Sequence, residues 1–305
     1  MKIVFVVNNK NNRIAKVLSG IVDYCRQWSL GSAEFIYTER KLHAVELATQ
    51  AAQNGCDFIV AVGGDGTLHE VVNGVLQSKI SKGKYPVIGL LPLGSANDFA
   101  RTANISSAVE ELLELIKNNS VQEIDLGKIH MQQSNEYRYF INIAGIGLGP
   151  EVVQSLERSS GVLGPKLSYF KHIIQGFLSY RKKDVKVIGN TWEWNGKLLQ
   201  MAVANGRYYG HAICTAPDAS LTDGQFQVVV FGDLSVWDYL KNLGILKKGI
   251  LIKHKEVHYF ESDVVHIKSN QPCGIEADGE YLGLAPVTIA IIPKAIRFLM
   301  PVDKS

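Results

Sequence analysis

The feature that most constrains this chain is a glycine-rich loop, residues 63–67 (GGDGT), between an apolar run and a helical pattern. Glycines let a backbone approach a ligand closely, and the helix that follows presents N–H groups and a positive dipole end. Thr67 adds a hydroxyl and Asp65 a carboxylate. Together these groups suit a phosphate with a divalent cation. The alternative is a tight strand-to-helix turn in which Thr67 is only the N-cap.

Strand and helix patterns alternate over the first 125 or so residues around this loop. Buried strands are predicted at residues 2–7, 33–38, 57–62 and 86–91, and helices at 13–28, 41–54, 67–77 and 107–117. The last helix should begin at a capping box of Ser107 and Glu110. This alternation predicts a doubly wound α/β domain whose parallel sheet is covered on both faces. Ligands bind at the carboxyl ends of such strands, where the GGDGT loop lies.

The pattern changes after Asp125, where apolar runs are joined by turns. Strands are expected at residues 137–143, 185–195, 198–205, 225–231, 263–268 and 287–292. They predict a mostly antiparallel β-sandwich. We therefore expect one domain at 1–128, to which 293–305 return, and a second at 129–292. Residues 165–182 resemble an amphipathic helix with a basic end, and 236–255 mix apolar side chains with five lysines.

Composition limits the classes of partner. Charged residues make up 20% of the 305 and the net charge is +3, which is too mild to indicate nucleic acid but compatible with an anionic membrane surface. Four scattered cysteines without a CxxC pair argue against a zinc site or disulfides and favour the cytosol. No apolar window is long enough to span a bilayer. We expect a cytoplasmic protein, peripheral to the inner face of the membrane, and a homodimer is left open.

A second loop matches the first. Residues 94–101 (GSANDFAR) follow the apolar run 87–91 and place a glycine, the Ser95 hydroxyl and the Asp98 carboxylate at another strand end. Helix capping by Ser95, Asn97 and Asp98 is the alternative, and it is compatible with ligand binding. Two such loops facing one crevice predict a site for phosphate and Mg²⁺, which prefers oxygen ligands.

The two loops together resemble the diacylglycerol kinase catalytic family, and within it the soluble bacterial lipid kinases. The GGDGT loop is also shared with NAD kinases, so the resemblance implies an NAD kinase-like first domain, whereas residues 97–101 (NDFAR) are more specific to lipid kinases. The chain departs from the family at residues 8–12, where Asn9 and Asn12 replace the expected proline and glycine. This departure puts ATP affinity in question.

The resemblance also implies roles for individual residues. ATP contacts would fall on Asn8, Thr38, Gly64, Asp65, Gly66, Thr67, Glu70 and Ser95. Catalytic carboxylates would be Asp65, Asp98 and Asp125. Glu280 would be the general base, although from the residues alone Asp278 and Gly279 first indicate a hairpin turn. A structural Mg²⁺ site would use Asp223 with the backbone carbonyls of Ser220 and Gln225.

The function expected from this resemblance is Mg²⁺-dependent transfer of the γ-phosphoryl group of ATP to a lipid hydroxyl. Diacylglycerol, phosphatidylglycerol, a sphingoid base and an undecaprenyl-type alcohol all remain open as the acceptor. Two alternatives are an NAD kinase, because of the shared loop, and a nucleotide- or lipid-binding protein without catalysis, because of the altered residues 8–12.

Overall fold

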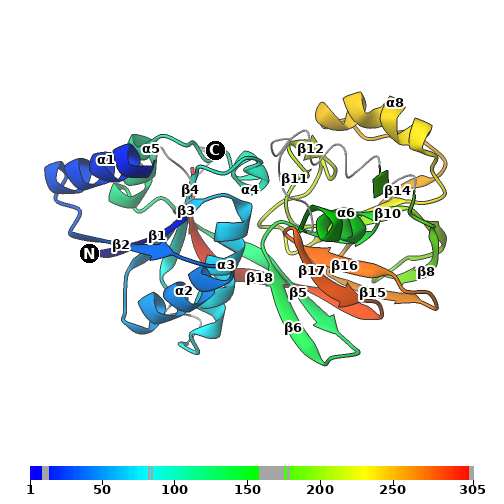
Figure 1. Ribbon diagram of the computed structural model, residues 1–305, viewed down its shortest axis with the longest axis horizontal. Coiled ribbons are helices and arrows are strands. Elements are labelled where there is room, and N and C mark those ends of the chain that lie inside the picture. Colours follow the sequence, from blue (N-terminus) through cyan, green and yellow to red (C-terminus); the bar gives the residue numbers. More distant parts are fainter. Residues whose placement is uncertain (9–13, 82, 84, 158–174, 177–178, 302–305) are drawn as a thin grey trace. The chain divides into compact units, whose positions relative to one another are not determined.

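The computed structural model describes residues 1–8, 14–81, 83, 85–157, 175–176 and 179–301. The chain divides into two compact units (Figure 1). The first consists of Met1–Ile124 with the segment that starts at Lys294, and the second of Asp125–Pro293. Strands β5 (Val121–Met131) and β18 (Val287–Leu299) contribute residues to both.

The first unit contains a parallel sheet in the order β2 (Ser32–Thr38), β1 (Lys2–Asn8), β3 (Phe58–Gly63), β4 (Val87–Pro92). The end of β18 extends it, with Phe298 beside Ile88. Every residue of β3 and β4 is buried. Continuous burial of this kind occurs where helices cover both faces of a parallel sheet.

Two pairs of helices supply this cover. Helices α1 (Ile14–Gln27) and α5 (Val109–Lys117) pack with alternate residues of β1, including Ile3 and Phe5, in one apolar cluster. Helices α2 (His43–Gln53) and α3 (Asp65–Gln77) contact each other on the opposite side of the sheet (Figure 1). The predicted doubly wound α/β architecture is confirmed.

The predicted capping box at the start of α5 is wrong. The helix begins at Val109, and the residue before it has no side-chain capping bond. Glu110 instead accepts a 2.5 Å hydrogen bond from the hydroxyl of Tyr24 in α1. The Glu110 carboxylate, which the local sequence pattern assigned to a helix cap, therefore makes a tertiary contact between two helices instead.

The second unit contains a six-stranded antiparallel sheet. Its order is β14 (Val257–Ser262), β13 (Phe226–Phe231), β10 (Gln200–Ala204), β7 (Ile143–Gly147), β16 (Gly274–Ala277), β17 (Glu280–Leu284). The facing sheet contains β9 (Glu193–Leu198), β8 (Lys183–Ile188), β15 (Val264–Ser269) and β18, with β5 and β6 (Glu136–Phe140) beside β18.

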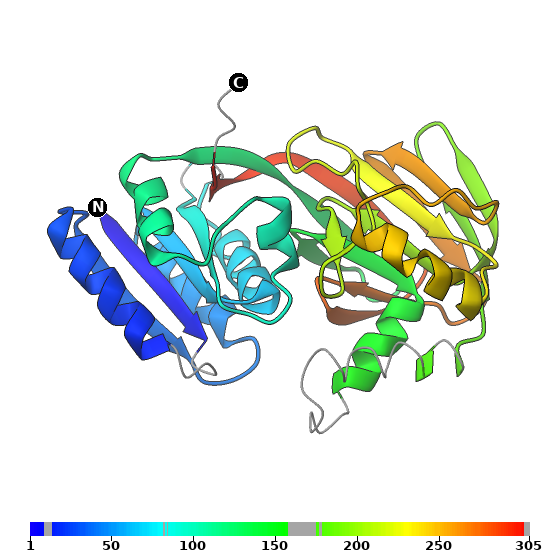
Figure 2. The same cartoon turned by 90° about the horizontal axis from the view of Figure 1, so that it is seen from above.

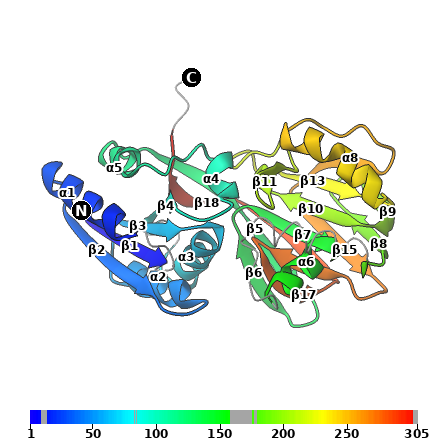
Figure 3. The same cartoon turned by 45° about the horizontal axis from the view of Figure 1, so that its top comes forward.

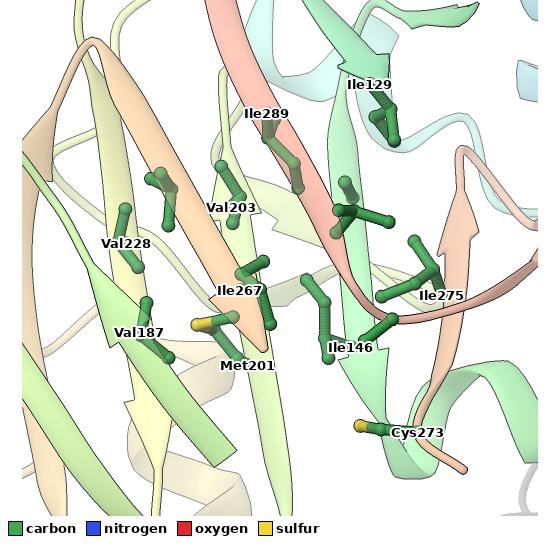
Figure 4. Close-up of a cluster of buried hydrophobic side chains, with 14 of the residues drawn as sticks. Ile129, Ile146, Val187, Met201, Val203, Val228, Ile267, Cys273, Ile275 and Ile289 are labelled. Atoms are coloured by element: carbon green, nitrogen blue, oxygen red, sulfur yellow. The ribbon is translucent and has the colours of Figure 1, made fainter. Parts of the chain in front are cut away.

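Apolar side chains from both sheets fill the space between them. Met201 and Val228 come from the six-stranded sheet, and Val187 and Ile267 from the other (Figure 4). The predicted β-sandwich is confirmed. The single strand expected at 185–195 is wrong in detail, because the chain turns at 189–192 and forms the hairpin of β8 and β9.

The described part of the second unit also contains two helices at positions where the sequence predicted none. Helix α6 (Leu148–Glu157) and helix α8 (Val236–Lys247) pack against the outer face of the six-stranded sheet, as Figures 2 and 3 show for α8. A short hairpin joins β11 (Tyr208–Tyr209) and β12 (Ile213–Cys214). The helix expected at 165–182 lies mostly outside the described residues.

Candidate functional site

A cleft of 560 Å³ lies at the carboxyl ends of the parallel strands in the first unit. Strands β2 and β3 flank β1, so the chain reverses its direction across the sheet at this point. Such switch points are where open α/β sheets bind ligands. All eight residues to which the sequence assigned nucleotide contacts line the cleft, namely Asn8, Thr38, Gly64, Asp65, Gly66, Thr67, Glu70 and Ser95. Residues 9–13, which include the altered part of the first loop, are outside the described residues.

The GGDGT loop forms the turn from β3 into α3. Gly64 is the N-cap and Asp65 the first helical residue, so Thr67 lies inside the first turn and the N-cap interpretation of Thr67 is wrong. The Thr67 hydroxyl accepts a 3.2 Å hydrogen bond from the Asn8 side chain. The first N–H groups of a helix have no acceptor within it, so they are available to an anion in the cleft.

The second loop approaches the first at backbone distance. A Cβ added to Gly94 would lie 2.4 Å from the Cα of Gly64, so only glycine fits. Asn97 adopts φ 53° and does not cap the following helix α4 (Asp98–Thr102) with its side chain. Its side chain turns back instead, accepting from the N–H of Gly94 and donating to the carbonyls of Pro92 and Gly94 at 3.0–3.3 Å. Asn97 therefore holds the loop, which corrects the capping interpretation of this residue.

The two carboxylates of these loops belong to neighbouring helix starts. Asp65 accepts a 3.0 Å hydrogen bond from the N–H of Phe99, and Asp98 is 5% exposed at the first position of α4. Oxygen donors fit Mg²⁺, which commonly takes one or two carboxylates and completes its shell with water and phosphate oxygens. Within the described ranges no group of three or more His, Cys, Asp or Glu side chains converges, so phosphate and water would have to supply the other ligands.

Glu70 reaches from α3 to the start of α2. Its carboxylate accepts from the N–H groups of Leu42 and Ala44 at 3.1 and 3.0 Å. It thereby fixes residues 38–44, which form one wall of the cleft. Arg40 and Lys41 line this wall and were not predicted from the sequence, although two adjacent cations, two and three positions after Thr38, were a visible signal.

The predicted hairpin at Asp278 is confirmed in the second unit. Asp278 and Gly279 have φ of 48° and 86° and connect β16 to β17. The Asp278 carboxylate accepts three backbone hydrogen bonds of 2.9–3.1 Å from residues 141–143. This clamp fixes the turn immediately before the half-exposed Glu280.

A buried acid connects this hairpin to an apolar pocket. Glu276 is fully buried and accepts hydrogen bonds from the Tyr209 hydroxyl at 2.8 Å and the N–H of Gly279 at 2.9 Å. Tyr209 lines the pocket together with residues of α6, α8, β10 and β13, namely Leu148, Val152, Gln200, Phe231, Tyr239 and Leu246. Burial raises the pKa of Tyr239 to about 12. Sequence reasoning missed Glu276, for which the signal was an acid inside an apolar strand.

The remaining predicted residues surround one loop of the second unit. Asp125 is fully buried, and its carboxylate accepts a 2.7 Å hydrogen bond from the N–H of Gly224. Asp223 is exposed and accepts from the N–H of Gln225 at 3.0 Å. One carboxylate with backbone carbonyls suits a hard cation. Asp125, a residue of β5, thus contacts this loop of the second unit, whereas Asp65 and Asp98 belong to the first unit.

Across the described residues, no helix combines the length and the apolarity that crossing a membrane requires.

Comparison with known proteins identifies relatives of both units. Residues 2–129 match the diacylglycerol kinase catalytic domain, and residues 144–300 match the YegS C-terminal NAD kinase beta sandwich-like domain. A diacylglycerol kinase of Bacillus subtilis is 28% identical over 265 residues, which are 86% of this chain and 84% of the relative. Another, from Staphylococcus aureus, is 28% identical over 272 residues, 87% and 81% of the two chains. A crystal structure of a diacylglycerol kinase from Bacillus anthracis is 19% identical, covers 98% of this chain and 97% of its own, and shares the fold with a TM-score of 0.72.

Proposed function

This chain belongs to the family of lipid kinases that join a diacylglycerol kinase catalytic domain to a YegS-type C-terminal domain, and we propose that it transfers the γ-phosphoryl group of ATP to a hydroxyl of diacylglycerol or a related lipid. The observation that carries the proposal is the 560 Å³ cleft of the first unit, where the two glycine-containing loops meet. In this proposal the first unit would be the nucleotide-binding domain and the second the acceptor-binding domain.

The first unit would hold the triphosphate by position and charge, which are the main requirements of phosphoryl transfer. The N–H groups at the start of α3 and the hydroxyls of Thr67 and Ser95 would bind phosphate oxygens. Asn8 orients the Thr67 hydroxyl through its 3.2 Å hydrogen bond. Glu70 would act on the nucleotide through the wall that it fixes, because both of its oxygens accept from that backbone.

Asp65 and Asp98 are the residues that would hold Mg²⁺, directly or through water. When bound, the ion would neutralise charge on the phosphate oxygens. Because Asp65 also accepts from the N–H of Phe99, its carboxylate is fixed in orientation. In the second unit, Asp223 and the carbonyls of Ser220 and Gln225 would hold a structural cation, and Asp125 would position that loop through Gly224.

Glu280 would accept the proton of the acceptor hydroxyl, a role worth about 10²–10⁴ in rate. Its position is set by the clamp at Asp278, which leaves the turn little freedom. An acyl chain of the acceptor would enter the apolar pocket beside Tyr209. Because the acceptor is a membrane lipid, the enzyme would act at the membrane surface.

The test is transfer of ³²P from γ-labelled ATP to a panel of acceptors dispersed in neutral detergent, with and without Mg²⁺. The panel contains diacylglycerol, phosphatidylglycerol, a sphingoid base, an undecaprenyl-type alcohol and NAD. We expect Mg²⁺-dependent labelling of a lipid and none of NAD. Labelling of NAD alone would replace the proposal with an NAD kinase, and ATP binding without labelling of any acceptor would indicate a binding protein.

A matched pair of variants isolates the proposed base. Glu280→Gln should lower kcat by about 10²-fold or more without changing ATP affinity. Glu261→Gln makes the same chemical change on the exposed part of β14 and should leave kcat unchanged. Equal activities of the two variants would remove Glu280 from the mechanism.

A further inference from the structure

Exposed apolar side chains concentrate in one short segment of the second unit. Trp237 is 72% exposed, the highest value among the large hydrophobic residues described as exposed. Ile245, Ile250 and Leu251 are also exposed, so four of the nine such residues in the described part of the chain fall between 237 and 251. Scattered single residues of this kind are ordinary, whereas a concentration marks an interaction site.

Helix α8 in this segment has two distinct faces. Tyr239 and Leu246 pack inward with β10 and β13 and line the apolar pocket. Trp237, Lys241, Ile245 and Lys248 follow one another at intervals of three or four residues, and all four are exposed. Residues at this spacing share one side of a helix. We call these four residues, with Ile250 and Leu251 that follow, the α8 face. Figure 3 shows α8 lying over β13, with its other side turned away from the sheet.

The segment has an excess of positive charge. Residues 236–255 contain five lysines and one acid, Asp238. That acid is engaged at the start of the helix, where it accepts from the N–H and the hydroxyl of Ser235. The lysines Lys241, Lys247, Lys248, Lys253 and Lys255 are all exposed. The surface is therefore cationic as well as apolar.

We propose that the α8 face docks this protein onto an anionic lipid bilayer. Interfacial helices bury tryptophan and aliphatic side chains at the level of the headgroups, while lysines among them pair with anionic lipids. Lysine stems also reach along an apolar surface and keep their ammonium groups in the headgroup layer. The choice of a bilayer rests on the proposed function, because the acceptor resides there. Docking would place the inner side of α8, and the pocket that it covers, next to the source of the lipid.

The test is co-sedimentation of the full chain with vesicles of phosphatidylglycerol and phosphatidylcholine, and with vesicles of phosphatidylcholine alone. We expect binding only to the anionic vesicles, and weaker binding at high salt because exposed charges are screened. Lys241→Gln combined with Lys248→Gln should lower the partition coefficient by about fivefold for each lysine removed. Trp237→Ala should lower it further, and the blue shift of tryptophan fluorescence on binding should vanish with Trp237→Phe.

Controls with the same chemistry lie elsewhere on the second unit. Tyr137 is an exposed aromatic residue with the Lys128 Nζ 4.1 Å from its ring centroid, so Tyr137→Ala also removes an aromatic group beside a cation. Lys268→Gln removes one exposed charge from β15. Both variants should bind vesicles as the parent chain does.

Three results would overturn the proposal: no binding of the parent chain to anionic vesicles, equal binding by the α8-face variants, or self-association that Trp237→Ala abolishes in place of vesicle binding. The last would assign the face to a second copy of the chain. Labelling of lipid in detergent micelles separates this inference from the proposed function. If the chain binds vesicles but transfers no phosphate in micelles, the proposed kinase activity is refuted and the docking proposal stands. If it transfers phosphate in micelles but does not bind vesicles, only the docking proposal is refuted.

Discussion

Replacing Gly94 with alanine tests whether the two loops must touch. The added Cβ would lie 2.4 Å from the Cα of Gly64 and 2.8 Å from Oδ1 of Asn97, whereas ordinary contacts begin near 3.4 Å. The loops would have to separate by about 1 Å, which also strains the 2.8 Å hydrogen bond from the N–H of Leu93 to the carbonyl of Gly63. The Gly64 contact is with backbone, so no side-chain rotation relieves it.

The magnitude follows from two opposing terms. Overpacking of this kind costs about 1–3 kcal/mol. Replacing a glycine also lowers the conformational entropy of the unfolded chain, which stabilises the folded state by about 0.4–1 kcal/mol. We therefore expect a net loss of roughly 0–2.6 kcal/mol in the stability of this region. A shift of about 1 Å in the phosphate-binding loops should lower kcat/KM for ATP by about 10²-fold.

Hydrogen exchange followed by mass spectrometry on peptides from β3 and α3 measures the stability term, and the labelled-ATP assay measures kcat/KM. Gly20→Ala in α1 is the matched control, because a Cβ there meets no atom within 4 Å. It should increase stability by about 0.5–1 kcal/mol and leave kcat/KM unchanged. If Gly94→Ala exchanged as slowly as the parent chain and kept its kcat/KM within twofold, the close approach of the loops would be irrelevant to the site.

Three further predictions concern carboxylates. Glu70→Gln keeps only one of the two acceptors for the N–H groups of Leu42 and Ala44, so calorimetry should show weaker ATP binding, by about tenfold, while kcat at saturating ATP changes little. Asp278→Ala removes three backbone hydrogen bonds and should destabilise the hairpin by about 2–4 kcal/mol; unchanged amide exchange at residues 141–143 would contradict the clamp. Glu276→Gln should raise KM for the lipid with ATP affinity unchanged, since it disturbs the hydrogen bonds to Tyr209 and Gly279; an effect on ATP binding instead would show that the pocket is not involved.

The parallel sheet and the glycine loops could be predicted because their determinants are local. Strands buried on both faces, such as β3 and β4, appear in the sequence as continuous apolar runs. The turn at Asp278 and Gly279 was similarly visible, because two adjacent residues determine it.

Features that depend on distant residues could not be predicted in this way. Glu110 is paired with Tyr24, 86 positions away, so its local pattern indicated a cap that does not form. Glu276 and Tyr209 are 67 positions apart, and the sequence around either residue contains no signal that predicts their hydrogen bond. Helix α8 was also not predicted. Its solvent-facing side carries apolar as well as charged residues, so the apolar residues that face the sheet do not stand out at helical spacing.

Strand β18 determines the order in which this chain can complete its structure during synthesis. Its first residues, including Ile289, lie in the core of the β-sandwich, while Phe298 pairs with Ile88 and packs edge-on against Phe99 in the first unit. The ribosome therefore makes the whole second unit before it releases the strand that borders β4. Domains generally fold in the order in which they emerge. Here the first unit starts to fold first, but its sheet is completed only after the segment around Phe298 has left the exit tunnel.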